Sequence, residues 1–191
     1  PTIENDGFFI EKNTWNILIR NAIKKEPTML IGHSGCGKTE IIDFIGKALN
    51  KIVFTQDMGT IQDTQSALLG VHRINSEGVS EFETAPFVEY VQSGNIVLLD
   101  ELSRAPLSSG NVLFPCLDRR KYLPIDIAGT KDIRKIIVNP ETSFFATANI
   151  GTEYSGTNLI DRALLDRFMI IELNFPKPEI EKEILVKRTG I

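Results

Sequence analysis

Residues 32–39 of the chain are Gly32-His33-Ser34-Gly35-Cys36-Gly37-Lys38-Thr39, and they match the phosphate-loop pattern G-x-x-x-x-G-K-[ST] at every position. The sequence on either side has the elements that such a loop requires. Residues 28–31 are a short apolar run that predicts a buried strand, and apolar residues at helical spacing predict a helix over 40–49. A chance match in an ordinary glycine-rich turn would not need this strand and helix. The stretch therefore predicts an α/β fold whose first loop binds a nucleoside triphosphate.

The residue types in this loop suit a polyphosphate. Glycines let consecutive backbone N–H groups turn toward the phosphates, and the N-terminus of the following helix adds a partial positive charge. Lys38 is expected to contact the β- and γ-phosphates, and the Thr39 hydroxyl is expected to hold Mg²⁺. The expected nucleotide-binding residues are Gly32, His33, Ser34, Gly35, Cys36, Gly37, Lys38, Thr39 and Glu40.

The bulk composition is that of an ordinary globular domain. The 191 residues are 42% hydrophobic and 24% charged, with a formal net charge of −4. This balance gives no electrostatic argument for nucleic acid or an acidic membrane as a partner, and the basic runs 119–121 and 131–135 are too short to change that. No run approaches the ~20 apolar residues of a membrane span, so no membrane partner is expected.

The two cysteines, Cys36 and Cys116, are not spaced as metal ligands. Cys116 falls in an apolar helical pattern, which predicts a core position. Unpaired cysteines in a chain with a nucleotide site indicate a reducing, intracellular compartment, and we expect the cytoplasm.

Strands and helices alternate along the rest of the chain. Helices are predicted over 15–23, 62–69, 85–92, 106–117 and 161–166, strands over 52–55, 95–99, 144–149 and 168–173, and β-hairpin insertions over 70–82 and 121–138. This alternation predicts a parallel sheet sandwiched by helices, with right-handed crossovers. We expect residues 1–175 to form the α/β core and residues 176–191 to begin a further helical stretch.

Two acidic residues follow the most apolar strand. Asp100 and Glu101 come directly after Ile96-Val97-Leu98-Leu99. In a parallel sheet the carboxyl ends of the strands line the ligand crevice, so both side chains are expected to face the nucleotide. Asp100 is expected to hold Mg²⁺, and Glu101 to orient and deprotonate the attacking water. A charged turn on the surface is the alternative, and the phosphate loop favours the catalytic interpretation.

Further polar candidates follow the later strands. Asn149 ends the strand over 144–149, where its amide could hydrogen-bond the attacking water or the γ-phosphate. Arg162 and Arg167 lie on or next to the short helix that follows, and either could reach a neighbouring subunit's γ-phosphate as an arginine finger. Arg104 is a further candidate for such an interface. A turn asparagine and salt-bridged surface arginines are the alternatives.

Together these segments resemble those of the AAA+ ATPases. Residues 32–39, 98–105 and 145–149 look like the Walker A, Walker B and sensor 1 segments of that family, and residues 164–168 look like its arginine-finger box. The stretch 69–86, with its hairpin, resembles the helix-2-insert branch, which includes MoxR-type ATPases, the dynein-related group, McrB-type GTPases and chelatase motor subunits. The resemblance implies a P-loop AAA+ core with β-hairpin insertions, ATP and Mg²⁺ as cofactors, and a homo-oligomeric ring, commonly a hexamer.

Residues 146–157 are especially similar to the cobaltochelatase subunit CobS. The chain departs from the family pattern in two places. Ser103 stands where MoxR proteins usually carry Asn, and the C-terminal helical lid with its sensor 2 arginine is largely missing, with only its start expected over 176–191.

Several functions are compatible with these motifs. The first is a ring-forming motor that hydrolyses ATP and remodels an unidentified partner protein, as a CobS-like or MoxR-like metal-insertion or assembly chaperone. The second is a nucleotide-gated scaffold with little turnover, against which Glu101 argues. An McrB-like GTPase is a third, because the motifs do not select the purine base. The sensor 1 and arginine-finger segments argue against a small-molecule kinase.

Overall fold

A five-stranded sheet forms the centre of the computed structural model, which describes residues 10–125, 134–149 and 161–175 and the single positions 178, 182 and 186. Its strand order is β2-β5-β8-β1-β9, and every pair of neighbouring strands is parallel. The strands are β1 (Thr28–Gly32), β2 (Val53–Asp57), β5 (Ile96–Asp100), β8 (Ser143–Asn149) and β9 (Met169–Leu173). The parallel α/β sheet predicted from the sequence is confirmed.

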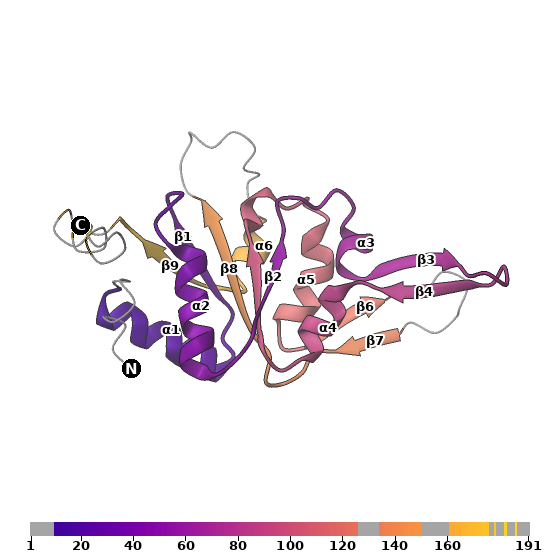
Figure 1. Ribbon diagram of the computed structural model, residues 1–191, viewed down its shortest axis with the longest axis horizontal. Coiled ribbons are helices and arrows are strands. Elements are labelled where there is room, and N and C mark those ends of the chain that lie inside the picture. The colour runs from indigo at the N-terminus through magenta and orange to yellow at the C-terminus, as the bar shows by residue number, and fades with distance from the viewer. Residues whose placement is uncertain are drawn as a thin grey trace.

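Helices cover both faces of this sheet (Figure 1). One face packs against α1 (Lys12–Lys24) and α2 (Lys38–Leu49), and the other against α3 (Thr64–Leu68), α4 (Pro86–Gln92), α5 (Ser109–Leu117) and α6 (Arg162–Leu165). In the part of the chain that the structure describes, none of these helices has the length and apolar character needed to span a membrane.

The central strand β5 shows why the sheet is covered on both sides. All four residues of Ile96–Leu99 are fully buried. Successive side chains of a strand point to opposite faces. Val97 and Leu99 therefore join the cluster that contains α4 and α5, whereas Ile96 and Leu98 join the cluster under α1 and α2. An uninterrupted apolar run is what a strand buried on both faces requires.

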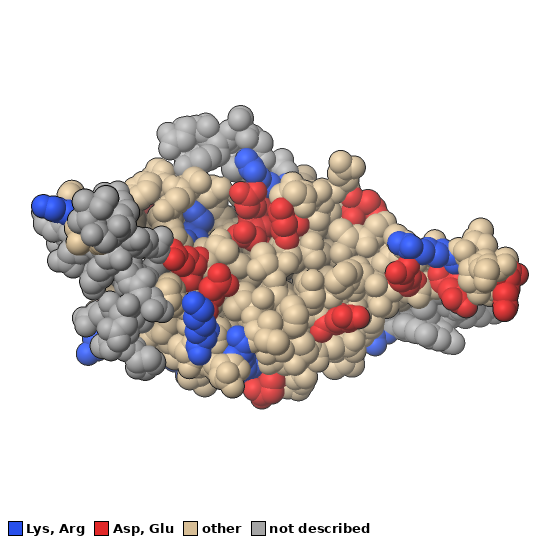
Figure 2. All heavy atoms as spheres, viewed as in Figure 1, with Lys and Arg blue, Asp and Glu red and all other residues tan. Residues whose placement is uncertain are grey.

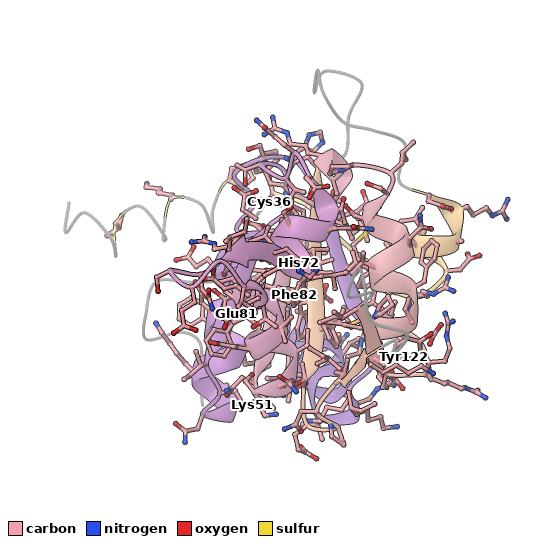
Figure 3. All side chains as sticks on the ribbon, turned by 90° about the vertical axis from the view of Figure 1, so that its right-hand side faces the viewer. Cys36, Lys51, His72, Glu81, Phe82 and Tyr122 are labelled. Atoms are coloured by element: carbon pink, nitrogen blue, oxygen red, sulfur yellow. The ribbon has the colours of Figure 1, made fainter. Side chains whose placement is uncertain are left out.

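Two antiparallel hairpins extend from the core. They pair β3 (Gly70–Ile74) with β4 (Ser80–Thr84), and β6 (Tyr122–Ile125) with β7 (Arg134–Ile137). Both lie at the end of the molecule away from α1 (Figure 1). His72 and Phe82 are paired residues of the first hairpin, and their rings meet edge to face with centroids 5.2 Å apart (Figure 3). Both predicted hairpin insertions are confirmed.

Some helix boundaries differ from those predicted. The helix predicted over 106–117 begins only at Ser109, and Leu102–Arg104 forms a separate 3₁₀ turn before it. The helix predicted over 62–69 begins at Thr64, because the Asp63 carboxylate accepts the Ser66 N–H at 2.8 Å and caps the helix there.

Candidate nucleotide-binding site

The phosphate loop, residues 32–39, lies between β1 and α2 at the carboxyl edge of the parallel sheet. Gly32 is in register with Asn149 at the end of β8, and Asp100 is in register with Asp57 at the end of β2. Because the strands run in the same direction, their last residues meet at one edge. The sheet therefore brings the loop, the acidic end of β5 and Asn149 together.

Glycines shape the loop in two ways. Gly35 and Gly37 have φ angles of 81° and 84°, a left-handed conformation that other residues rarely adopt. Gly32 instead requires space, because a Cβ there would collide with the Leu173 carbonyl oxygen and lie 2.9 Å from Cys36 Sγ. No side chain caps α2 at Gly37, and an uncapped helix N-terminus is well suited to an anion.

Lys38 connects the loop to the end of β8. Its ammonium donates hydrogen bonds to the carbonyl oxygens of Gly32 at 3.0 Å and His33 at 2.8 Å, and to Asn149 Oδ1 at 2.9 Å. The side chain is buried. Exchange of these neutral acceptors for phosphate oxygens would give stronger, charge-assisted hydrogen bonds. The structure thus brings together the loop lysine and the sensor asparagine.

A group of three oxygen-bearing side chains lies beside the loop. Thr39 Oγ1 donates to Asp100 Oδ1 at 3.3 Å, and Thr147 Oγ1 donates to the same oxygen at 2.5 Å. Hydroxyl and carboxylate oxygens are the ligands that Mg²⁺ prefers, directly or through water. Thr39 and Asp100, the two residues that the sequence offers as Mg²⁺ ligands, thus lie side by side with oxygen atoms suited to that ion.

Glu101 follows Asp100 in a left-handed backbone conformation, with φ of 53°. Its carboxylate oxygen Oε2 accepts a hydrogen bond from Arg104 Nη1 at 2.8 Å. The same oxygen lies 2.8 Å from the position that a Cβ on Gly59 would occupy, and Asp57 Oδ1 lies 3.3 Å from that position. Arg104, which the sequence offered as an interface residue, contacts the candidate base within its own chain. Acidic side chains gather beside a basic one over the ends of β2 and β5 (Figure 2).

The phosphate loop, the two acids at the end of β5 and the polar residues of β8 line one cavity of about 310 Å³. Its lining residues are Ser34, Gly35, Gly37, Lys38, Thr39, Glu40, Asp100, Glu101, Thr147 and Asn149. The predicted loop residues His33 and Cys36 are not among these lining residues. The His33 ring stacks on Phe175 with centroids 5.6 Å apart, and Cys36 Sγ lies 3.8 Å from Lys38 Nζ.

The two candidate arginine fingers lie elsewhere. Arg162 is exposed at the start of α6. The Arg167 guanidinium lies 4.4 Å from the centroid of the Phe114 ring, donates to the Ala163 carbonyl oxygen, and is 3.8 Å from Asp118 Oδ2. Hydrogen bonds from Arg120, supported by Arg167, hold the pKa of Asp118 below its ordinary value. Neither candidate lines the cavity of its own chain.

Two parts of the site were not predicted from the sequence. Thr147 lies in the cavity wall between the acids and Asn149, and Gly59 leaves room for the Glu101 carboxylate. The position of Thr147 could have been predicted, because it stands two residues before Asn149 in a strand and its side chain therefore points to the same face. The role of Gly59 could not have been predicted, since it lies far from Glu101 in the sequence and no local pattern relates the two residues.

Comparison with known proteins agrees with this geometry. Residues 27–168 match the family model described as "AAA domain (dynein-related subfamily)". The chain is 27% identical over 190 residues to "Putative chaperone BssE" of Thauera aromatica, an alignment that covers 96% of this chain and 64% of that protein. It is also 27% identical over 169 residues to "Protein CbbQ" of Hydrogenophilus thermoluteolus, covering 86% of this chain and 59% of that protein. The chain thus spans about 60% of the length of these relatives.

A solved structure supports the fold. It is from Cytophaga hutchinsonii, is described as a "putative ATPase", and superimposes with a TM-score of 0.68 at 24% identity. The superposition covers 94% of this chain and 51% of that one. With the matched segment containing the phosphate loop, both acids, Asn149 and Arg167, the chain belongs to the dynein-related subfamily of AAA domains, as a MoxR-like member of the AAA+ ATPases.

Proposed function

We propose that the chain is the motor core of a protein that binds Mg-ATP, hydrolyses it and remodels a partner protein. The observation that carries this proposal is the convergence of Lys38, Thr39, Asp100, Glu101 and Asn149 on one cavity. These residues come from three separate segments of the chain: the phosphate loop, the end of β5 and the end of β8. A binding loop alone would not need an acid pair and an asparagine at the same edge of the sheet.

Each of these residues has a distinct task in hydrolysis. Loop N–H groups and Lys38 bind the phosphates. Thr39 and Asp100 would hold Mg²⁺, which when bound would neutralise phosphate charge. Glu101 accepts a proton from the attacking water, whose oxygen forms a bond to the γ-phosphorus while the bond to the β-γ bridging oxygen breaks. Asn149 orients the water or the γ-phosphate without adding negative charge. The products are ADP and inorganic phosphate.

A ring arrangement would complete the site. Arg162 and Arg167 do not line the cavity of their own chain, which suits residues that act on a neighbour's nucleotide. We therefore propose a homo-oligomeric ring, with a hexamer as its form.

The wider role is proposed by similarity. The name of the relative from Thauera aromatica includes the word chaperone, and we propose assembly or metal-insertion chaperoning for this chain too. The CobS-like stretch 146–157 supports the same role, although residues 150–157 lie outside the described ones. We further propose that residues 1–175 are the core, that 176–191 begin a helical lid, and that the free thiols of Cys36 and Cys116 belong to a reducing cytoplasm.

The proposal is tested by measuring nucleotide binding and turnover together. Calorimetric titration of the intact protein with ATP and with GTP should show binding of ATP, and Lys38→Ala should abolish it because the ammonium supplies a charge-assisted contact. The protein should then hydrolyse ATP, which is measured as the release of inorganic phosphate. Preference for GTP would favour a McrB-like GTPase, and tight binding without turnover would favour a nucleotide-gated scaffold. Retained affinity in Lys38→Ala would contradict the assignment of the loop.

A further inference from the structure

A buried threonine on β8 contacts both acidic residues at the end of β5. Thr147 is 2% exposed, donates its hydroxyl hydrogen to Asp100 Oδ1 at 2.5 Å, and accepts the Glu101 N–H at 3.0 Å. The directions are unambiguous, because an ionised carboxylate only accepts and a backbone N–H only donates. One hydroxyl thus joins the side chain of one acid to the backbone of the other.

The Glu101 N–H needs this acceptor because the strand pairing ends before it. The ladder between β5 and β8 runs as far as Leu99 opposite Ala146. The chain then turns away at Glu101, whose φ of 53° is uncommon for a residue with a side chain. Thr147 Oγ1 takes the place of a strand carbonyl and holds the backbone from which the Glu101 carboxylate enters the cavity.

The contact with Asp100 is equally specific. Thr39 and Thr147 both donate to Oδ1 of Asp100, so Oδ2 takes no part in these two hydrogen bonds. If Thr39 turns to a metal ion, as the proposed function requires, its hydrogen bond to Asp100 is given up. Thr147 then maintains the orientation of the Asp100 carboxylate, since its hydroxyl is buried and donates from the neighbouring strand β8.

We propose that Thr147 is a positioning residue for both acids, a role that rests on the proposed function. Its hydroxyl fixes the spacing between the oxygen ligand of the metal site, Asp100, and the base, Glu101. It touches neither nucleotide phosphate nor water in this assignment and acts only through its two neighbours.

The chain contains a matched control. Thr142 is also 2% exposed, and its hydroxyl donates to the Val91 carbonyl oxygen at 3.0 Å and accepts the Gly94 N–H at 3.1 Å. It belongs to the opposite end of the sheet, where Lys51 donates to the Gly94 carbonyl oxygen. Figure 3 shows Lys51 and Cys36 of the phosphate loop at opposite ends of the molecule. Thr142 therefore reproduces the burial and bonding of Thr147 without its proposed role.

The experiment compares Thr147→Val, Thr142→Val and Thr147→Ser in the intact protein. Both valine variants should lower the thermal unfolding temperature, because each removes the two hydrogen bonds of a buried hydroxyl and leaves a backbone N–H without its side-chain acceptor. Only Thr147→Val should lower kcat, by about tenfold or more, and raise the Mg²⁺ concentration needed for half-maximal ATP affinity. Its affinity for ATP without metal should stay within about twofold of wild type. Thr147→Ser should recover most of the kcat, because it keeps the hydroxyl.

Three results would overturn the proposal. One is a Thr147→Val kcat equal to that of wild type. Another is a loss of metal-free ATP affinity in Thr147→Val, which would show general distortion of the loop. The third is an unchanged Mg²⁺ dependence of ATP affinity. A wild-type kcat no higher than that of Glu101→Gln would contradict the proposed base. The Mg²⁺ dependence of ATP affinity would still test the role of Thr147, because affinity is measured without turnover. If Thr147→Val does not fold, Thr147→Cys keeps the side-chain volume, weakens both hydrogen bonds and is read in the same way.

Discussion

At the scale of a single residue, three contacts fix the position of Glu101. Its N–H donates to Thr147, its carbonyl oxygen accepts the Arg104 N–H at 2.8 Å, and its carboxylate pairs with the Arg104 guanidinium. A left-handed conformation at a residue with a side chain persists only where the surroundings stabilise it, and such residues cluster at functional sites. The pair with Arg104 engages Oε2, and Oε1 takes no part in it. One carboxylate oxygen is thus available to a water molecule.

Glu101→Gln tests the role of this carboxylate. The amide keeps the shape of the side chain and loses the base, so the variant should bind Mg-ATP as wild type does. Its kcat should fall by about 10²-fold or more, because general-base catalysis contributes at least that much. Calorimetry gives the affinity and phosphate release gives the rate. Turnover at the wild-type rate would assign Glu101 a structural role.

Cys116 gives a pH-dependent stability prediction. Burial raises the pKa of its thiol from the ordinary 9.0 to about 12, and the side chain is fully buried in the core, as the sequence predicts. The folded state therefore binds the proton more tightly than the unfolded state. The resulting stability is complete below about pH 9 and is lost as the pH rises toward about 12. Wild type should lose about 1.4 kcal/mol of unfolding free energy between about pH 8 and about pH 10 through this group.

Urea unfolding of wild type and Cys116→Ala across that range measures the effect. The unfolding free energy of each protein is compared with its own value at the lower pH, so the cost of the cavity left by the smaller side chain cancels. The alanine variant should show the shallower pH dependence. Equal slopes would show that the thiol ionises as easily in the folded protein as in the unfolded chain.

At the scale of elements, α2 carries the phosphate loop and must lie close to β2. Gly46 of α2 allows this approach, because a Cβ there would lie 2.6 Å from Val53 Cγ2 and 2.9 Å from the Lys51 carbonyl oxygen. The contact explains a glycine in the middle of a helix, where its propensity is poor. The position of α2, and with it the helix N-terminus at the phosphate loop, depends on this contact.

Gly46→Ala should therefore destabilise the protein, although alanine is the better helix former. The expected loss is about 1–3 kcal/mol, typical of overpacking a close contact with backbone. Gly110→Ala in α5 is the comparison, because a Cβ there would meet the end of the Phe114 ring at 2.8 Å, and a ring end can move. Thermal or urea unfolding should show the larger loss for Gly46→Ala. A stabilised Gly46→Ala would mean that α2 can shift away from β2 without cost.

At the scale of the whole molecule, the arginine assignments depend on a second copy of the chain. Arg167 packs on Phe114 and near Asp118 of its own chain, whereas Arg162 is exposed. Within one subunit these contacts stabilise the segment between α6 and β9. A role as an arginine finger requires that the guanidinium also reach the phosphate of a neighbouring copy.

Mixing two inactive variants tests this directly. Arg167→Ala and Lys38→Ala should each be inactive in the proposed ring, because an arginine finger is worth about 10³-fold or more in rate and the lysine is needed for binding. Mixed rings contain interfaces that pair an intact Lys38 with an intact Arg167, so ATPase activity should partly return.

The controls separate catalysis from folding. Thermal unfolding of Arg167→Ala reports the loss of its contacts with Phe114 and Asp118, and Arg162→Ala provides a variant without such contacts. Differently tagged subunits confirm that the two proteins assemble together. Absence of recovery in confirmed mixed rings would show that Arg167 acts within its own subunit.

The sequence alone determined the features that depend on neighbouring residues. The glycine pattern of the phosphate loop, the four-residue apolar run of β5 and the acids after it are local, because backbone conformation and strand burial follow from residue types a few positions apart. Together with the alternation of strands and helices and the segments at 145–149 and 164–168, these features predicted the parallel sheet and the membership of the AAA+ family. The two hairpins were predicted from the residues within 70–82 and 121–138. The helix start at Thr64 was missed although Asp63 is a typical cap.

Tertiary structure decided which distant residues meet. Lys38 and Asn149 are 111 positions apart, and Thr147 lies 46 and 47 positions from the two acids that it joins. Such pairs depend on the order and register of parallel strands, which the packing of both core clusters sets across long crossovers. The same packing directs Arg167 toward Phe114 of its own chain. No local pattern contains this information, because the residues of a strand do not specify which other strand will pair with it.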